Sequence, residues 1–228
     1  MDKRIYMKKI VLDVDGVLLN FMKSFDETAK SFLPRKVEFF KDEYKQDYYH
    51  LSKRIGGSEK EADEILEYMQ DASVYERLLP LDGAKEAVKK IKEAGFKVYV
   101  VTAVPERAQE MRLINLKNAL DFVPDEIHCV GMGKSKKEII EKINPDVFID
   151  DRIDYLASVP NVYHTVWCDQ REAQSNLESQ VSVHVHSLKE WVDSYMPIVV
   201  KNLDNHYNNR VPLQKELKLE SVSRKYKF

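Results

Sequence analysis

The chain has 228 residues, of which 32% are charged and 43% hydrophobic, and its formal net charge is -2. This composition indicates a soluble globular protein with one α/β domain and an insertion, or with two small domains. The charge gives no reason to expect a nucleic-acid or membrane surface, and no apolar run approaches the roughly 20 residues of a membrane span. The charged N-terminus, MDKRIYMKK, lacks the apolar segment of a secretory signal, and the two cysteines, Cys129 and Cys168, lie in or beside apolar runs. We therefore expect a cytoplasmic protein with reduced thiols.

The first predicted element is a buried strand in the stretch KKIVLDVDGVLLNF, residues 8–21. Its apolar run at residues 10–12 ends in Asp13-Val14-Asp15-Gly16, and Gly16 permits a tight backbone turn. Two carboxylates in a crevice at the carboxyl end of a strand suit a hard cation such as Mg²⁺ and a phosphate group. An acidic turn without any function is the alternative at this point.

Residues 17–80 show no convincing strand pattern and are expected to form a helical cap inserted after the first strand. The segment 17–33 is predicted to be a turn followed by a helix, with Phe21, Phe25, Ala29 and Phe32 along one stripe. Ser58 and Glu61 form a capping box for a second helix, which ends near Gln70.

From residue 81 onward, helices alternate with apolar strands. Asp82 is expected to cap a helix that ends at Ala94, Pro105 to lie in the first turn of a helix to about Leu120, and Ser135 with Glu138 to form a capping box for a helix to Ile143. Strands are expected at 96–101, 126–130, 147–149, 161–167 and 181–185, and a last helix from Ser187 to about Tyr195. This alternation predicts an α/β fold with a doubly wound parallel sheet. Residues 1–16 and 81–196 would form the core, 17–80 the cap, and 197–228 a C-terminal extension of undefined role.

Ligands of such sheets bind outside the carboxyl ends of the strands, so the residues at those ends are the candidates for chemistry. They are Asp13 and Asp15 after the first strand, Thr102 after the second, Lys134 beside the helix that follows the third, and Asp150 and Asp151 after the fourth. Each has a simpler interpretation as a strand end, a solvated loop lysine or a helix cap, and Lys136 or Lys137 is an alternative to Lys134. The complete set in this order is much less expected by chance than any single member.

The set resembles the four motifs of the haloacid dehalogenase superfamily of phosphatases, over residues 8 to about 190. Within that superfamily the chain is most similar to the 5'(3')-deoxyribonucleotidase group. That group has an Asp-x-Asp-Gly-Val-Leu motif with a phenylalanine eight residues after the first aspartate, here Phe21, and a small helical cap after the first strand. Its Leu-x-Pro-x-x-Gly-Ala motif, which leads into the next helix, is similar to the segment 79–84, LPLDGA.

The resemblance implies a Mg²⁺-dependent phosphomonoesterase that forms an aspartyl-phosphate. The implied roles are nucleophile for Asp13, acid and base for Asp15, phosphate contacts for Thr102 and Lys134, and metal binding for Asp13, the Asp15 carbonyl group, Asp151 and, through water, Asp150. Positive charge is needed in such a site because a carboxylate must approach a phosphate dianion. An aspartate at position 15, rather than tyrosine or threonine, favours a phosphatase over a dehalogenase or a P-type pump.

Departures from the nucleotidase pattern make the substrate less certain than the chemistry. The usual Thr-Ser-Pro is Thr102-Ala103-Val104-Pro105 here, so Ala103 stands in a substrate-binding position without a hydroxyl group, and Asn20 replaces an acid. Phe21 is either a platform for a base or part of the cap core. A 5'-nucleotidase acting on (deoxy)nucleoside monophosphates is the leading interpretation, and a sugar-phosphate phosphatase or a silent binding protein of the same fold are alternatives. The expected partner is a small phosphate monoester, with no nucleic acid and no membrane, and the sequence is compatible with a homo-oligomer.

Three further patterns carry little weight. The stretch 131–135, GMGKS, lacks the first glycine of a Walker A loop, because His128 stands there. His184 and His186 share one face of a strand, but no third zinc ligand is evident. The basic end, residues 224–227, is too short to indicate nucleic-acid binding.

Overall fold

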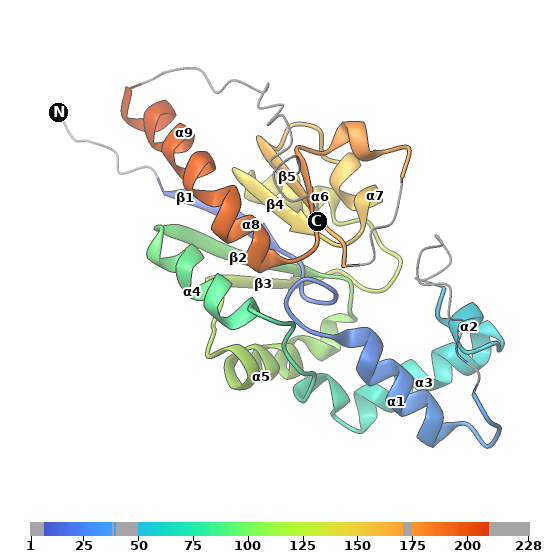
Figure 1. Cartoon of the computed structure of the whole chain (residues 1–228). Helices are drawn as coiled ribbons and strands as arrows, with labels where there is room; N and C mark the ends of the chain where they lie inside the picture. Colours follow the sequence, from blue (N-terminus) through green and yellow to red (C-terminus); the bar gives the residue numbers. More distant parts are fainter. Residues whose placement is uncertain (1–6, 38, 40–49, 171–174, 210–228) are drawn as a thin grey trace, which may run out of the picture.

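The computed structural model describes residues 7–37, 39, 50–170 and 175–209. Its centre is a six-stranded, all-parallel sheet in the order β3-β2-β1-β4-β5-β6, which confirms the predicted fold class (Figure 1). The strands are β1 (Lys8–Leu12), β2 (Phe96–Thr102), β3 (Glu126–Cys129), β4 (Val147–Asp150), β5 (His164–Cys168) and β6 (Val183–Val185). The first strand therefore lies in the middle of the sheet, between β2 and β4.

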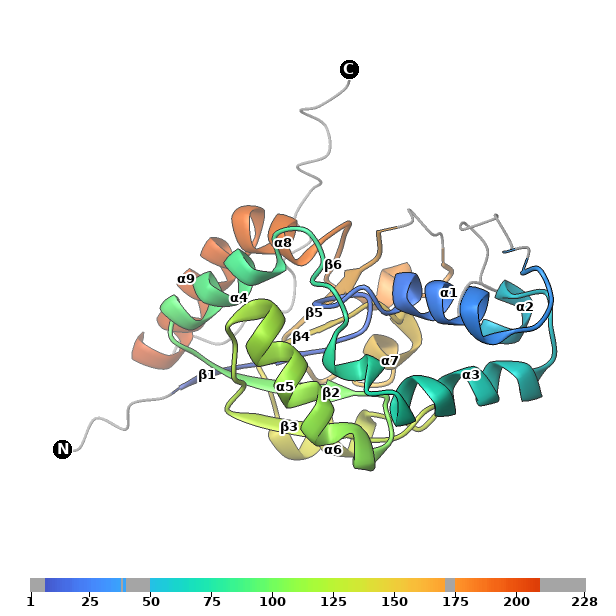
Figure 2. The same ribbon diagram turned by 90° about the horizontal axis from the view of Figure 1, so that it is seen from below.

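Alternate residues of the central strands supply two separate hydrophobic clusters, one on each face of the sheet. Ile10 and Leu12 belong to one cluster, and Val11 belongs to the other. The first face is covered by α4 (Ala84–Glu93), α5 (Gln109–Leu120), α8 (Leu188–Ser194) and α9 (Met196–Asn209), and the second by α6 (Lys137–Ile143) and α7 (Ile153–Ala157) (Figure 2). Burial on both faces explains why these strands are continuous apolar runs.

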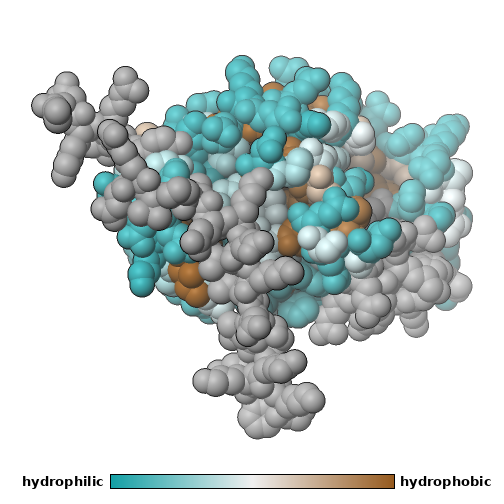
Figure 3. All heavy atoms as spheres, turned by 90° about the horizontal axis from the view of Figure 1, so that it is seen from above, coloured by the Kyte–Doolittle hydropathy of each residue, from teal (hydrophilic) through white to brown (hydrophobic). Residues whose placement is uncertain are grey.

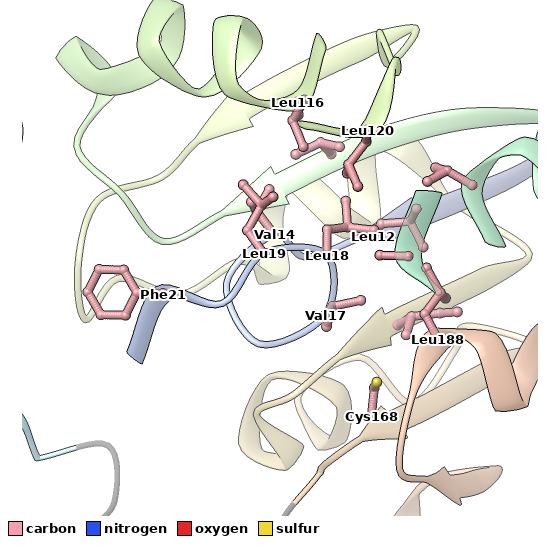
Figure 4. Close-up of a cluster of buried hydrophobic side chains, with 14 of the residues drawn as sticks. Leu12, Val14, Val17, Leu18, Leu19, Phe21, Leu116, Leu120, Cys168 and Leu188 are labelled. Atoms are coloured by element: carbon pink, nitrogen blue, oxygen red, sulfur yellow. The ribbon is translucent and has the colours of Figure 1, made fainter. Parts of the chain in front are cut away.

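Figure 4 shows how the loop after β1 is anchored in the first cluster. Leu18 and Leu19 lie with Leu12 beneath Leu116 and Leu120 of α5, whereas Phe21 stands apart at the start of α1 (Phe21–Phe32). Leu18 and Leu19 are fully buried. Apolar packing in this cluster therefore fixes the position of the loop that carries the acids.

The cap consists of α1, α2 (Leu51–Arg54), α3 (Glu59–Asp71) and the 3₁₀ turn η2 (Val74–Glu76), and no strand occurs among the described residues of this segment. The capping box of Ser58 and Glu61 at the start of α3 is present as predicted. Two short paired segments join the cap to the core. The Asn20 N–H donates to the Leu79 carbonyl (2.9 Å), and the Leu81 N–H donates to the Leu18 carbonyl (3.0 Å). Both chain connections therefore pass side by side into the cap, which protrudes from the core in Figure 1.

Several predicted boundaries are wrong. The N-cap of α4 is Gly83, not Asp82, because Gly83 adopts a left-handed conformation (φ 72°) that lets the chain enter the helix directly. The predicted Ser135–Glu138 capping box is absent, since the N-cap of α6 is Lys136. The short helix α7 was not predicted, because its five residues are too few to show a helical period.

The first part of the predicted C-terminal extension is the helix α9, which packs on the core. Its Val199 and Leu203 are fully buried in the same cluster as the sheet. Lys8 forms an ion pair with Asp204 (2.8 Å), and the Tyr207 hydroxyl donates to Asp146. Residues 197–209 therefore belong physically to the core, and residues 210–228 lie outside the described part of the chain.

In the face drawn in Figure 3, hydrophilic residues predominate and hydrophobic ones form small separate patches. None of the helices in the described ranges combines the length and the apolar character needed to cross a membrane. Cys129 and Cys168 are both free thiols.

His164 is a buried core histidine and makes stability depend on pH. Trp191 Nε1–H donates to His164 Nε2 (3.1 Å), and burial lowers the pKa of His164 to about 4. Because the unfolded chain binds a proton near pH 6.5 and the folded chain does not, the free energy of unfolding should fall by about 2 kcal/mol from this residue between pH 7 and pH 5. Urea unfolding of His164→Gln, which keeps an acceptor but cannot titrate, should show a shallower pH dependence than the natural protein.

His186→Gln is the matched control, since His186 is exposed. Equal pH dependence of the natural protein and His164→Gln would contradict the assignment of this proton to His164.

Candidate active site

Asp13, Asp150 and Asp151 meet where two neighbouring strands end. Asp13 directly follows β1, and its N–H donates to the Ile149 carbonyl of β4 (3.0 Å). Asp13 is 5% exposed and Asp150 is fully buried. One carboxylate oxygen from each of the three aspartates lies within 4.8 Å of the others. The predicted convergence of the residue 13 and residue 151 side chains is therefore present.

The turn after Asp13 brings the backbone against Asp151. Gly16 has φ 85°, and a Cβ atom at this position would lie 2.7 Å from Asp151 Cγ. The Leu18 and Leu19 N–H groups donate to the Val14 carbonyl (2.8 and 2.9 Å), which closes the turn. Only glycine fits here, because both the backbone conformation and the close approach of Asp151 exclude a side chain.

The lysine of this site is Lys136, whereas Lys134, the residue predicted from the sequence, is exposed on the loop before α6. Lys136 Nζ lies 2.8 Å from Asp13 Oδ1 and 2.7 Å from Asp150 Oδ2, and its side chain is 1% exposed. The reason is that α6 begins one residue after Lys136, which places Lys136 on the same stripe as the buried Ile140 and Ile143. This spacing of four and seven residues can be read from the sequence, but the predicted capping box placed the start of the helix at Ser135 instead of Lys136.

Asp150 holds Lys136 in place. Its Oδ2 accepts the bond from Lys136, and its Oδ1 accepts the Arg152 backbone N–H (2.9 Å). Burial raises the pKa of Asp150, although the positive charge of Lys136 acts in the opposite direction. Burial alone would lower the pKa of Lys136, but the negative charges of Asp13 and Asp150 outweigh it, and the pKa of Lys136 is raised. Since both oxygens of Asp150 are engaged, this aspartate is placed to contact a metal through water rather than directly.

Thr102 and Ala103 lie at the end of β2, which is the neighbour of β1 on the side opposite β4. Thr102 is fully buried, and its Oγ1 has no hydrogen-bond partner among the residues that the structure describes. Asp13 Oδ1 also lacks a hydrogen bond of good geometry within the described ranges, although Lys136 is its ionic neighbour. Buried polar atoms without partners are rare, so these two mark a place that a bound group would fill.

Asp15 is paired with Arg112, a residue that was not predicted for the site. Arg112 Nη2 donates to Asp15 Oδ2, and the guanidinium group lies 4.7 Å from the centre of the Tyr75 ring. Burial raises the pKa of Asp15 to about 6, against the lowering effect of Arg112. An acid with this pKa can both give and accept a proton near neutral pH.

Asp13, Asp15, Thr102, Lys136 and Asp151 line a cavity of about 350 Å³ between the cap and the core. Phe21 borders it, 9% exposed, with its ring nearly parallel to that of Tyr75 (centres 6.3 Å apart, 11° between planes). Apolar side chains from both parts complete the wall: Phe21, Met22, Leu51 and Tyr75 from the cap, and Leu81, Val104 and Met132 from the core. A polar floor of acids below an apolar wall suits a charged group carried on a flat or apolar body.

The acids of the floor suit a hard cation. Carboxylate and carbonyl oxygens are the ligands that Mg²⁺ takes in proteins, and here the Asp13 and Asp151 side chains bring carboxylate oxygens within 4.8 Å of one another. The only metal-ligand group found among the described residues is that of Asp13, Asp150 and Asp151. His184 is not part of it and stacks instead on Trp167 (4.0 Å between ring centres).

Solved structures with similar folds share little sequence with this chain. A dehalogenase with an intermediate complex has a TM-score of 0.57 and 17% identity, covering 89% of this chain and all of that chain (100%). CbbY from Rhodobacter sphaeroides, in complex with phosphate, has a TM-score of 0.54 and 14% identity over 82% and 96% of the two chains. YfnB from Bacillus subtilis, bound to magnesium, has a TM-score of 0.55 and 17% identity over 82% and 97%.

A comparison with curated protein sequences found no significant match. A family model, by contrast, matches residues 7–150, well over half of the chain, and these residues carry all the acids of the site except Asp151. The chain therefore belongs to the haloacid dehalogenase-like hydrolases.

Proposed function

We propose that this protein is a Mg²⁺-dependent phosphomonoesterase that acts on (deoxy)nucleoside 5'-monophosphates. The observation that carries the proposal is the buried Asp13 carboxylate beside Lys136 at the cavity. The Thr102 hydroxyl group at the same cavity has no hydrogen-bond partner among the described residues. A negatively charged nucleophile next to a fixed cation is what attack on a phosphate dianion requires.

In the first half of the reaction, an Asp13 oxygen attacks phosphorus, the bond to the leaving oxygen breaks, and Asp15 gives its proton to that oxygen. The products of this half are an alcohol and an aspartyl-phosphate. Asp15 then takes a proton from a water molecule that attacks phosphorus, which releases inorganic phosphate and restores Asp13. Thr102 and Lys136 contact the phosphoryl oxygens throughout. A bound Mg²⁺ would neutralise part of the phosphate charge.

Asp15 favours an ester substrate over an organic halide. An alkoxide is a poor leaving group and needs a proton, whereas a halide ion leaves without one. Burial places the pKa of Asp15 at about 6, in the range where this proton is available. The magnesium of YfnB and the phosphate of CbbY, two proteins with similar folds, agree with this chemistry.

The wall of the cavity favours a nucleobase over a simple sugar. The hydroxyl groups of a sugar need polar partners, whereas a base has flat faces that pack on apolar and aromatic side chains. Phe21 and Met132 line the cavity and offer such surfaces. A sugar-phosphate phosphatase is the second candidate, since Asn20, Arg152 and Gln170 at the cavity also offer polar contacts.

The test is a magnesium-dependent assay with substrates that differ only by the base. Deoxyuridine 5'-monophosphate should be hydrolysed with a kcat/KM about tenfold or more above that of 2-deoxyribose 5-phosphate, because burial of one base on aromatic side chains contributes about 1–3 kcal/mol. Equal values, or better hydrolysis of glucose 6-phosphate, would replace the nucleotidase by a sugar-phosphate phosphatase. Failure to hydrolyse even 4-nitrophenyl phosphate would leave only a silent binding protein.

A further inference from the structure

Arg112 is a fully buried cation that lies beside the catalytic cavity without lining it. It projects from α5, and Nη2 donates to Asp15 Oδ2. One oxygen of Asp15, Oδ2, therefore already accepts a hydrogen bond from a donor in a fixed position. The other, Oδ1, is buried and has no hydrogen-bond partner within the described part of the chain. The two oxygens of Asp15 are thus unequal, and only Oδ1 is left without a hydrogen-bond partner among the described residues.

We propose that Arg112 is a positioning residue for Asp15, which holds this carboxyl group so that Oδ1 exchanges the proton with the leaving oxygen. The inference rests on the proposed phosphatase function. A carboxyl group at the end of a short side chain rotates readily, and proton transfer needs one oxygen at hydrogen-bond distance from the reacting atom. A donor locked on Oδ2 keeps the proton on Oδ1 and fixes its direction.

Arg112 is itself held rigidly by contacts with the base of the cap. Its guanidinium group stacks on Tyr75 at 4.7 Å, and Tyr75 is 1% exposed. One turn further along α5, Asn115 bonds both backbone groups of Leu78: Oδ1 accepts the Leu78 N–H (3.1 Å), and Nδ2 donates to the Leu78 carbonyl (2.9 Å). The helix that carries Arg112 is therefore tied to the segment that returns from the cap.

The hydrogen bonding of Arg112 favours a positioning role over a purely stabilising one. Its Nε and Nη1 are buried and have no acceptor among the described residues. A buried guanidinium with unused donors is unfavourable for folding, and apolar side chains of similar volume often serve stability equally well. The presence of an arginine at this position is explained if its one hydrogen bond, which it donates to Asp15, serves the reaction.

The experiment compares two substrates that differ in their need for a proton. Ethyl phosphate expels a strongly basic alkoxide, whereas 4-nitrophenyl phosphate expels a weakly basic phenolate, and kcat/KM reports only the steps through formation of the aspartyl-phosphate. For Arg112→Met, kcat/KM should fall about 100-fold with ethyl phosphate, the usual size of a lost acid contribution, and change little with 4-nitrophenyl phosphate. Inhibition by inorganic phosphate should stay close to that of the natural protein, because Arg112 does not line the cavity.

Two further variants keep the test decisive. Asn115→Leu disturbs the same contact between α5 and the cap without touching Asp15, so any loss should be equal for both substrates. Arg112→Lys keeps the buried charge, replaces Arg112→Met if that variant does not fold, and should show a smaller but still substrate-dependent loss. Equal losses with both substrates in the Arg112 variants, or none, would overturn the positioning role while the phosphatase stands. A natural protein that hydrolyses neither substrate would overturn the proposed function and this inference with it.

Discussion

Replacement of Lys136 with methionine is expected to lower kcat/KM for phosphomonoesters about 10²–10³-fold, the effect of removing one fixed group that stabilises transition-state charge. It should also reduce the free energy of unfolding by about 3–5 kcal/mol, because two buried carboxylates lose their common partner. Lys136 Nζ lies 2.8 Å from Asp13 and 2.7 Å from Asp150, and methionine fills nearly the same space without charge. Urea unfolding in EDTA measures the second effect without a metal ion that would replace the lost charge.

Lys134→Met is the matched control, since it makes the same change two residues earlier on an exposed side chain. Its stability should stay within about 0.5 kcal/mol of the natural protein, as is usual for surface substitutions, and its activity should be close to normal. A larger loss of activity in Lys134→Met than in Lys136→Met would show that the loop lysine, as first expected from the sequence, contacts the phosphate.

The difference between these two lysines shows what local sequence can and cannot decide. The acids at positions 13, 15, 150 and 151 were found because each follows an apolar run, and parallel strands bring their carboxyl ends to one edge of the sheet. The lysine follows no strand directly. Its identity depends on the residue at which α6 begins, and a shift in that boundary moves a different lysine onto the buried stripe.

Arg112 could not be found in the same way. It lies among the mixed residues QEMRLINLKNAL of α5, where a charged side chain is normally exposed. Its partner, Asp15, is 97 positions away in the sequence, and only the packing of α5 against the loop after β1 brings the two together. The helix α9 was missed for a related reason, since its apolar residues Val199 and Leu203 are separated by mostly polar ones.

Asp13→Asn is expected to abolish turnover, with kcat at least about 10⁴-fold lower, as for other residues that attack the substrate. An amide nitrogen or oxygen is a poor nucleophile, whereas the shape of the side chain hardly changes. Removal of one negative charge beside the phosphate should leave the affinity for inorganic phosphate unchanged or higher. Steady-state assays with 4-nitrophenyl phosphate, combined with phosphate binding by calorimetry, separate these two effects.

The same substitution at the exposed Asp82 is the control for the chemical change itself and should leave kcat unaltered. A second measurement addresses the covalent step, because acid quenching of the natural protein during turnover should leave phosphate attached to the chain, and Asp13→Asn should show none. If Asp13→Asn still released phosphate while Asp151→Asn did not, water rather than Asp13 would be the attacking group. The buried carboxylate would then serve only to hold a cation, and its ion pair with Lys136 would have to be explained by charge balance alone.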